Sequence, residues 1–431
     1  MARTRIVATL GPATWSDPMI SALLDAGADV FRLNFAHGTR EEHGRLIDAV
    51  RRLAGGRPTA IIQDLAGPKL RLATGVRGNA GDVVPLALPS TVRAGDPVLL
   101  ADGLMQLEVI DRAHSRVVVA GDIPAGKGIN LPSSRLDIPA LTDKDREDLR
   151  FGVARGVDFV SLSFVRRAAD LDEVRAGGVP VIAKIETAEA ARHIDDIVAA
   201  ADGVMVARGD LGVEIPIERV PVVQKELIAL ANRAAKPVIT ATQMLRSMVD
   251  SPLPTRAEAT DVANAVLDGT DAVMLSEETA IGHFPIEAVR IMGRIMGEAE
   301  RLLAPRTVAP DDDVPGMIAE AACRMAERVH AKGIVVPTRS GSTARRVARH
   351  RPAVPIVALT PDEAVRRRLS LVWGVTAVTA SWFADTDALL TGFRGPVRAT
   401  RLVPEGAPVV VTGGWPFGGP AATNLVHVTT L

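Results

Sequence analysis

Four apolar runs between residues 180 and 279 each end in charged or hydroxyl side chains, and this repetition constrains the fold more than any other sequence feature. The runs are PVIAKIET (180–187), GVMVARGDLG (203–212), PVITATQM (237–244) and AVMLSEET (272–279). Each predicts a buried parallel strand, and together they deliver to one rim Lys184, Glu186, Arg208, Asp210, Thr242, Ser276 and Glu278. Barrels of parallel strands carry their active sites at the carboxyl ends of the strands. The pattern therefore predicts a barrel with chemistry at its rim.

Four earlier runs have the same strand character: RIVATLGP (5–12), VFRLNFA (30–36), AIIQDLAG (60–67) and FVSLSF (159–164). Amphipathic segments such as 19–28 and 42–55 lie between them. Eight alternating strands and helices favour an α/β fold with a closed (β/α)8 TIM barrel, and an open doubly wound sheet is the alternative. Thr142 with Asp145 three positions later predicts a capped helix before the fourth run.

The alternation breaks once, from Ala73 to Asp137, where short strand-like runs occur without a helical pattern. This predicts an inserted small β-barrel domain, interpreted as a mobile lid, with an insertion of no function as the alternative. Residues 304–316 are typical of a linker, and the strands and helices expected beyond it predict a C-terminal α/β domain. The predicted domains are 1–72 with 138–305, 73–137, and 306–431.

Composition excludes several function classes for these 431 residues. A net charge of −1 and 3% aromatic residues, with no Tyr, argue against nucleic-acid binding. Cys323 is the only cysteine, which excludes an intrachain disulfide and predicts a buried helix thiol. Because no apolar stretch is long enough to cross a membrane and no signal peptide precedes the first run, we expect a cytoplasmic protein without membrane contact.

Glu186 and Asp210 close two neighbouring predicted strands and are candidate Mg²⁺ ligands, since this cation takes oxygen ligands and keeps substrate oxygens and water. A surface ion pair is the alternative for each. Lys184 lies two residues before Glu186, hence on the same side of its strand, where an ammonium would neutralise charge on a transferred phosphoryl group or an enolate. A Schiff-base lysine is the alternative.

Several further residues suit an anionic substrate. The glycines of 207–212 allow backbone N–H groups to approach a carboxylate, and Thr242 suits a proton relay or a simple strand-end hydrogen bond. Arg32 and Arg71 are candidate phosphate ligands near Asn34 and Asp64. In the C-terminal domain, a second phosphate cradle or a plain helix cap is expected at Thr338, Ser340, Gly341, Ser342 and Thr343.

Long motifs carry a family resemblance from Thr4 to the C-terminus: RLNFAHGT (32–39), DLAGPKLR (64–71), GKGINLP (126–132), ARGDLGVEIP (207–216), KPVITATQML (236–245) and TDAVMLSEETA (270–280). The chain closely resembles pyruvate kinase. The resemblance implies transfer of the phosphoryl group of phosphoenolpyruvate to ADP in glycolysis, by a homotetramer regulated through its C-terminal domain. It implies Mg²⁺ as cofactor, with Mn²⁺ able to replace it, and a sugar phosphate or nucleotide monophosphate as effector.

The resemblance also implies individual roles. Glu186 and Asp210 would hold Mg²⁺, Lys184 would stabilise the transferred phosphoryl group and the enolate, and the N–H groups of Gly209 and Asp210 would hold the substrate carboxylate. Thr242 would serve the proton relay, and Arg32 would face the transferred phosphate. The nucleotide contacts would be Arg71, Lys127, Asn34 and His37.

The chain departs from the family pattern where most members bind K⁺. Asn34 and Asp64 remain, but Ala36 and Leu65 replace a serine and a threonine, and Lys69 replaces a glutamate. Lys69 would then supply the monovalent cation next to Asn34 and Asp64, as in the K⁺-independent subgroup. We therefore predict that K⁺ is not required. Thr187 and Glu277 are further departures, and they leave the nucleotide preference open.

Overall fold

The computed structural model describes residues 2–101, 103–132, 138–306, 313–415 and 422–431. Eight parallel strands close into a barrel in the order β1-β15-β14-β13-β12-β11-β3-β2. These strands are β1 (Arg5–Leu10), β2 (Val30–Asn34), β3 (Ala60–Asp64), β11 (Phe159–Leu162), β12 (Val181–Ile185), β13 (Gly203–Ala207), β14 (Val238–Ala241) and β15 (Ala272–Leu275). Each lies within one of the eight predicted runs. The closed barrel confirms the predicted fold and excludes the open sheet.

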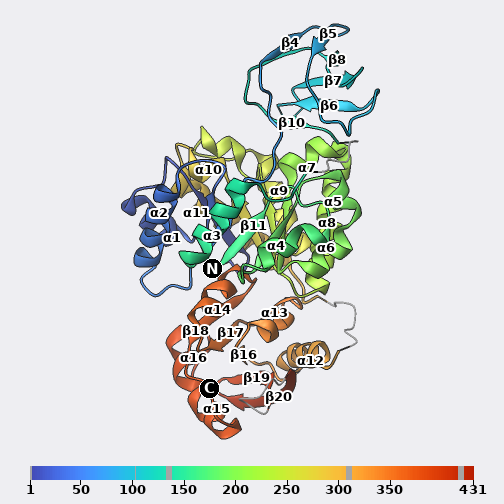
Figure 1. Cartoon of the computed structure of the whole chain (residues 1–431). Coiled ribbons are helices and arrows are strands. Elements are labelled where there is room, and N and C mark those ends of the chain that lie inside the picture. Colours follow the sequence, from blue (N-terminus) through green and yellow to red (C-terminus); the bar gives the residue numbers. More distant parts are fainter. Residues whose placement is uncertain (1, 102, 133–137, 307–312, 416–421) are drawn as a thin grey trace.

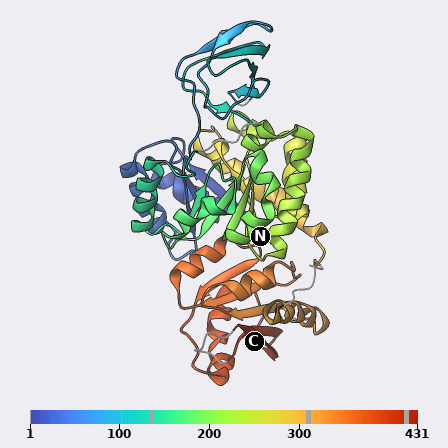
Figure 2. The same ribbon diagram turned by 45° about the vertical axis from the view of Figure 1, so that its right-hand side comes forward.

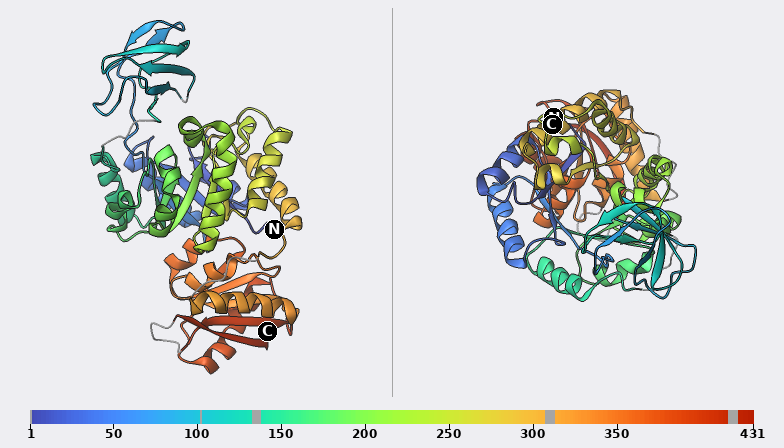
Figure 3. Two further views of the ribbon diagram at one scale, coloured as in Figure 1. Left: turned by 90° about the vertical axis from the view of Figure 1, so that its right-hand side faces the viewer. Right: turned by 90° about the horizontal axis from the view of Figure 1, so that it is seen from above.

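Helices surround the barrel, as the view from above shows (Figure 3). They are α1 (Asp17–Ala26), α2 (Arg40–Leu53), α3 (Asp143–Ala154), α4 (Asp172–Arg175), α5 (Ala188–Arg192), α6 (Ile194–Ala200), α7 (Arg208–Glu214), α8 (Val220–Arg233), α9 (Arg256–Asp268), α10 (Glu277–Ala280) and α11 (Pro285–Ala299). Helix α3 starts at the predicted capping box, in which the Thr142 hydroxyl accepts from the N–H of Asp145. Apolar side chains fill the space between helices and strands and also the interior of the barrel.

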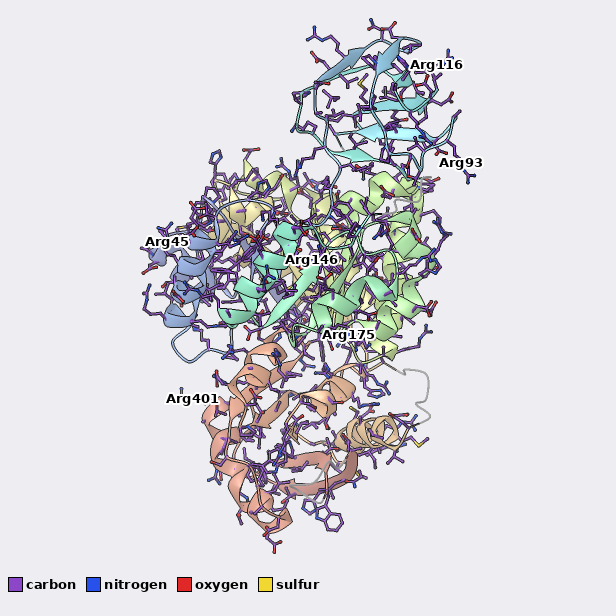
Figure 4. All side chains as sticks on the ribbon, viewed as in Figure 1. Arg45, Arg93, Arg116, Arg146, Arg175 and Arg401 are labelled. Atoms are coloured by element: carbon purple, nitrogen blue, oxygen red, sulfur yellow. The ribbon has the colours of Figure 1, made fainter. Side chains whose placement is uncertain are left out.

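The inserted domain follows β3 and is built from antiparallel strands (Figure 1). A five-stranded sheet has the order β10-β6-β7-β8-β5, and β4 pairs with β9. The strands are β4 (Val76–Gly78), β5 (Val83–Pro85), β6 (Pro97–Leu100), β7 (Met105–Val109), β8 (His114–Val119), β9 (Gly121–Ile123) and β10 (Ile129–Asn130). Charged side chains such as Arg93 and Arg116 project from this domain (Figure 4).

The C-terminal domain is a five-stranded sheet in the order β18-β17-β16-β19-β20, in which only the β19–β20 pair is antiparallel. Its strands are β16 (Gly333–Pro337), β17 (Ile356–Thr360), β18 (Val375–Thr379), β19 (Pro408–Gly414) and β20 (Thr423–Thr430). Its helices are α12 (Val314–Arg328), α13 (Ser342–Ala348), α14 (Glu363–Arg368), α15 (Thr386–Gly392) and α16 (Arg394–Thr400). Short 3₁₀ turns at 168–171, 217–219, 246–249, 300–302 and 369–371 complete the elements.

The three parts are stacked, with the inserted domain at one end of the barrel and the C-terminal domain at the other (Figure 2). Because the chain enters the inserted domain directly after β3, the carboxyl ends of the barrel strands face that domain. The proposed boundaries at 72/73, 137/138 and 305/306 stay a prediction. In the described residues, none of the helices has the length and apolar character needed to cross a membrane.

Candidate active site

A buried ionic cluster occupies the carboxyl-end rim of the barrel. Lys184, in β12, is 8% exposed, and its Nζ lies 2.8 Å from Glu186 Oε1, 2.8 Å from Ser163 Oγ and 3.4 Å from Asp64. Arg32, in β2, donates from Nε to Asp64 Oδ2 at 2.8 Å. Neighbouring strands of the closed sheet thus bring two cations and two carboxylates together, as their positions at strand ends predicted.

Charge pairing within this cluster decides its protonation. Burial disfavours the charged form of Asp64, but the charges of Lys184 and Arg32 hold the pKa of that carboxyl below its usual value. Burial likewise opposes the charged form of Lys184, yet Asp64 and Glu186 raise its pKa. Lys184 is therefore an ammonium, because loss of its proton would leave the buried carboxylates of Asp64 and Glu186 without this positive charge.

Glu186 and Asp210 form the candidate cation site. Glu186 is 1% exposed, and burial, followed by repulsion from Asp210, raises the pKa of its carboxyl despite the opposing charge of Lys184. The N–H of Phe164 donates to Glu186 Oε2 at 2.8 Å and fixes its orientation. Two carboxylate groups that repel one another at a rim fit a hard divalent cation that takes its other ligands from substrate and water. No group of three or more His, Cys, Asp or Glu suited to a metal occurs in the described residues.

Thr242 lies at the end of β14 in a strained conformation. Its φ of 68° is an outlier for a β-branched residue, which is typical of functional sites. Its hydroxyl accepts from the N–H of Gly209 at 2.7 Å and donates to the carbonyl of Ala241 at 2.6 Å. Before substrate binds, the Gly209 N–H predicted to hold the substrate carboxylate is thus occupied by Thr242.

Two other residues of the opening pattern have structural contacts. Arg208 binds Asp261 at 2.7 Å and the carbonyl of Thr242 at 2.7 Å, so it supports the strained turn. Glu278 is 1% exposed and accepts from the N–H groups of Ser276 at 2.7 Å and Leu245 at 3.1 Å. Both side chains stabilise rim loops.

The predicted nucleotide contacts are spread along the rim and the lid connection. Arg71 is exposed, donates to the carbonyl of Gly126 at 3.0 Å and bridges to Gly128, next to the exposed Lys127. Asn34 Oδ1 accepts from the N–H of Ala36 at 3.1 Å, and His37 is exposed. Within the described residues, Arg71 and Lys127 lie on the lid side and have no contact with the Lys184 cluster.

Lys69 has a different partner from the one that the sequence predicted. Its Nζ lies 3.1 Å from Asp210 Oδ1 and 5.9 Å from the ring centre of Phe164, whereas Asp64 is held by Arg32, Lys184 and Ser161. In the ligand-free structure Lys69 thus contacts Asp210, because Lys184 and Arg32 already neutralise Asp64 while Asp210 faces the lid connection that carries Lys69. The role of Lys69 next to Asn34 and Asp64 stays a prediction.

Sequence reasoning missed Ser163 and Phe164. Both follow β11 directly, and the run FVSLSF that ends with them was the signal, since the ends of the other strands carry site residues. Phe164 has a φ of 55°, which aims its N–H at Glu186.

The predicted effector loop precedes α13. The N–H of Gly341 donates to Thr338 Oγ1 at 2.9 Å, that of Ser342 lies 3.4 Å from Ser340 Oγ, and the Thr343 and Thr423 hydroxyls are 2.6 Å apart. The hydroxyls thus form a local turn. The family resemblance also predicts that residues 413–424 close over this loop, and part of that segment lies outside the described residues.

Comparison with known families settles the assignment. The family model described as the pyruvate kinase barrel domain matches residues 1–88 and 83–289, and the model of the pyruvate kinase alpha/beta domain matches residues 316–429. The chain belongs to the pyruvate kinase family. It is 44% identical to pyruvate kinase 2 of Synechocystis over 99% of this chain and 79% of that protein. It is 43% identical to the pyruvate kinase of Geobacillus stearothermophilus over 99% of this chain and 80% of the relative.

A solved pyruvate kinase structure from Cryptosporidium parvum superposes with a TM-score of 0.91 at 34% identity, covering 100% of this chain and 96% of that one. As a pyruvate kinase family member, the chain is an enzyme, a phosphotransferase of glycolysis. The family is generally Mg²⁺-dependent, which agrees in kind with the carboxylate pair at the rim.

Proposed function

We propose that this chain transfers the phosphoryl group of phosphoenolpyruvate to ADP, giving pyruvate and ATP, at the rim cluster under the inserted domain. The observation that carries the proposal is the buried Lys184 ammonium, 2.8 Å from Glu186 and held beside Asp64 and Arg32. A buried, permanently charged ammonium is suited to a reaction in which negative charge moves onto a transferred phosphoryl group and then onto an enolate.

In this reaction the bond between phosphorus and the enol oxygen breaks, a bond to a β-phosphate oxygen of ADP forms, and the enolate takes a proton at its methylene carbon. Lys184 stabilises the enolate oxygen, and Arg32 binds the phosphoryl oxygens. Gly209 and Asp210 bind the substrate carboxylate through their N–H groups. The hydrogen bond that the Gly209 N–H donates to the Thr242 hydroxyl must break for this to happen. The freed Thr242 hydroxyl then serves the proton relay.

Glu186 and Asp210 would hold Mg²⁺, or Mn²⁺ in its place, which supplies positive charge to the phosphoryl and carboxylate oxygens. Arg71, Lys127, Asn34 and His37 would contact the nucleotide once the inserted domain closes over it. Burial of the site by that closure would strengthen each of these charge interactions.

A coupled assay that detects ATP formed from phosphoenolpyruvate and ADP tests the proposal. An Mg²⁺-dependent lyase or aldolase acting on an enolate would consume substrate without forming ATP. A paralogue that only binds metabolites would show binding without turnover. Either result would overturn the proposed reaction.

The proposed enzyme does not need K⁺. Ala36 and Leu65 lack the oxygens that a bound K⁺ would use, and the Lys69 ammonium lies within the site, 3.1 Å from Asp210 Oδ1. We expect full activity with Mg²⁺ in Na⁺ or tetramethylammonium buffer and little gain on adding KCl. Lys69→Glu should be nearly inactive and should not recover with K⁺. Strong, saturable activation of the wild type by K⁺ but not by Na⁺ would contradict the idea.

Regulation and assembly complete the proposal. A phosphorylated sugar or nucleotide monophosphate would bind the loop of Thr338, Ser340, Gly341, Ser342 and Thr343 and shift the phosphoenolpyruvate saturation curve of a cytoplasmic homotetramer. The hydroxyls and N–H groups of this loop support an anion ligand. Measuring the saturation curves of wild type and Ser340→Ala with each metabolite tests the effector site, and identical responses of the two proteins would contradict it. Light scattering measures the size of the assembly.

A further inference from the structure

A short turn joins β2 to α2 and carries two of the residues proposed to contact the nucleotide, Asn34 and His37. The strand ends at Asn34, and the helix begins at Arg40. Because His37 is exposed, packing of its own side chain does not fix the conformation of the turn. The side chains that bind the backbone of the turn must do so.

His43, the fourth residue of α2, packs against this turn and is 5% exposed. Its Nε2 lies 2.8 Å from the carbonyl oxygen of His37. Its ring stacks on the buried ring of Phe35, with 4.0 Å between the ring centres and 16° between the ring planes. One buried side chain thus binds the turn through a polar contact and through an aromatic contact.

Gly38 gives the turn the backbone conformation and the space that this contact needs. Its φ is 77°, in the left-handed region that glycine adopts without strain. A Cβ at this position would lie 3.2 Å from Glu42 Oε2 and 3.4 Å from His43 Nε2. A larger residue would therefore press on the imidazole that holds the turn.

The contact with His37 decides where the imidazole of His43 carries its proton. A carbonyl oxygen can only accept, so Nε2 carries the hydrogen and donates it. Nδ1 is buried and has no hydrogen-bond partner among the described residues. Because a proton on Nδ1 would be a buried donor without an acceptor, the ring is the neutral Nε2–H tautomer.

The groups around His43 also keep it uncharged. Burial lowers the pKa of His43, and the positive charge of Lys144 acts in the same direction. The His37 carbonyl and the charges of Asp148 and Glu42 oppose this shift without reversing it. The imidazole is therefore neutral at neutral pH.

Packing alone does not account for a histidine at this position. An apolar side chain would fill the same space without leaving a buried nitrogen unpaired. Buried polar atoms without partners are rare in native structures, and each calls for a specific role. What His43 adds to an apolar side chain is the hydrogen bond to the His37 carbonyl.

We propose that His43 is a positioning residue for nucleotide binding. By holding the His37 carbonyl and the Phe35 ring, it keeps the turn in the conformation in which Asn34 and His37 bind ADP. This inference rests on the proposed phosphoryl transfer to ADP and adds to it a residue that touches neither substrate. Since the proposed contacts of phosphoenolpyruvate lie elsewhere on the rim, His43 acts on the affinity for ADP alone.

Steady-state kinetics on the full chain test the proposal with two variants. His43→Leu removes the donor, whereas His43→Gln keeps an N–H donor that reaches the same carbonyl. His43→Leu should raise KM for ADP roughly tenfold and change kcat and KM for phosphoenolpyruvate less than about twofold. His43→Gln should restore KM for ADP to within roughly threefold of wild type.

Two further variants complete the series. His43→Asn, whose amide is too short to reach the His37 carbonyl, should raise KM for ADP as His43→Leu does, and it gives the same test should the leucine variant not fold. His114→Leu, at an exposed histidine of β8, is the control and should match wild type. If these variants raise both Michaelis constants equally, or leave KM for ADP unchanged, His43 is only structural and the proposal is overturned.

Calorimetric titration with ADP and Mg²⁺, without phosphoenolpyruvate, measures the nucleotide affinity without turnover. A chain that binds ADP but forms no ATP contradicts the proposed reaction alone, and the comparison of variants still decides the role of His43. A wild type that binds no ADP contradicts both. Nitrogen NMR of the labelled imidazole should show the neutral Nε2–H tautomer at neutral pH, and a protonated or Nδ1–H ring would overturn the proposal.

Discussion

At the scale of single residues, the site depends on charged side chains whose burial costs free energy and whose ion-pair partners offset that cost. Lys184 is buried between two carboxylates, with its ammonium 2.8 Å from Glu186 and 3.4 Å from Asp64. Arg32 also pairs with Asp64. Removing Lys184 leaves Glu186 and Asp64 without that counter-charge. Since buried carboxylates retain their charge only with partners, the effect extends beyond the loss of one hydrogen bond.

Lys184→Ala should therefore lower kcat far more than it raises KM for phosphoenolpyruvate. Loss of one interaction made mainly in the transition state costs about 3 kcal/mol, roughly a hundredfold in rate. Steady-state kinetics measure both constants, and Lys225→Ala, at a half-exposed lysine on α8, is the matched control. A Lys184→Ala enzyme with near-normal kcat would remove this lysine from the mechanism.

Cys323 should be unreactive in the folded chain. It lies in α12 with its Sγ 3.7 Å from the carbonyl of Val347, and burial raises the pKa of its thiol to about 12. Because the thiolate is the reactive form, almost none is present at pH 8. A chromogenic disulfide reagent should label the thiol slowly in buffer and rapidly in denaturant. Rapid native labelling would show that the thiol is accessible and ionised.

At the scale of elements, the eight barrel strands were predictable because strands buried on both faces consist of continuous apolar residues. Their end residues were predictable for the same reason, since a polar group directly after such a run lies at the rim. The partners of those residues were not. Lys69 contacts Asp210 because of how the lid connection crosses the rim, and the positive φ of Thr242 depends on Arg208 and Gly209, which no local pattern encodes.

Two helix glycines give a matched test of element packing. A Cβ on Gly152 of α3 would lie 1.9 Å from Gln63 Oε1 of β3, whereas a Cβ on Gly297 of α11 would meet nothing within 4 Å. Gly152→Ala should lower the free energy of unfolding by about 1–3 kcal/mol through overpacking. Gly297→Ala should raise it by roughly 0.5–1 kcal/mol, because alanine favours the helix. Denaturant unfolding measures the free energy of unfolding of both variants. If Gly152→Ala raises it as Gly297→Ala does, α3 can move away from β3.

At the scale of the whole molecule, buried charges join the C-terminal domain to the amino-terminal end of the barrel. Arg351 and Asp271 are 1% and 5% exposed at their side chains and lie 3.1 Å apart. Arg351 also donates to Asn232 at 2.9 Å and to the carbonyl of Gly269 at 2.7 Å, and its guanidinium lies 4.9 Å from the ring centre of Trp373. Near the N-terminus, the Arg3 guanidinium donates a further hydrogen bond to the carbonyl of Pro352 at 2.6 Å.

Arg351→Met should uncouple the C-terminal domain from the barrel, because it removes the cation that forms an ion pair with buried Asp271. The carboxylate then keeps the backbone N–H groups of Trp373 and Val238, each at 3.1 Å, as its hydrogen-bond donors among the described residues. Breaking one partner of a buried pair costs about 3–5 kcal/mol, whereas losing the exposed pair of Arg398 and Glu405 should cost about 0–1 kcal/mol. Scanning calorimetry should show the C-terminal domain melting earlier in Arg351→Met, with Arg398→Ala unchanged as the control. If both variants melt as wild type does, the interface is held by apolar packing and the arginine contributes little.

Any effector signal from the loop of Ser340 must cross this interface, so Arg351→Met should also abolish the effector-induced shift of the phosphoenolpyruvate saturation curve while leaving activity at saturating substrate intact.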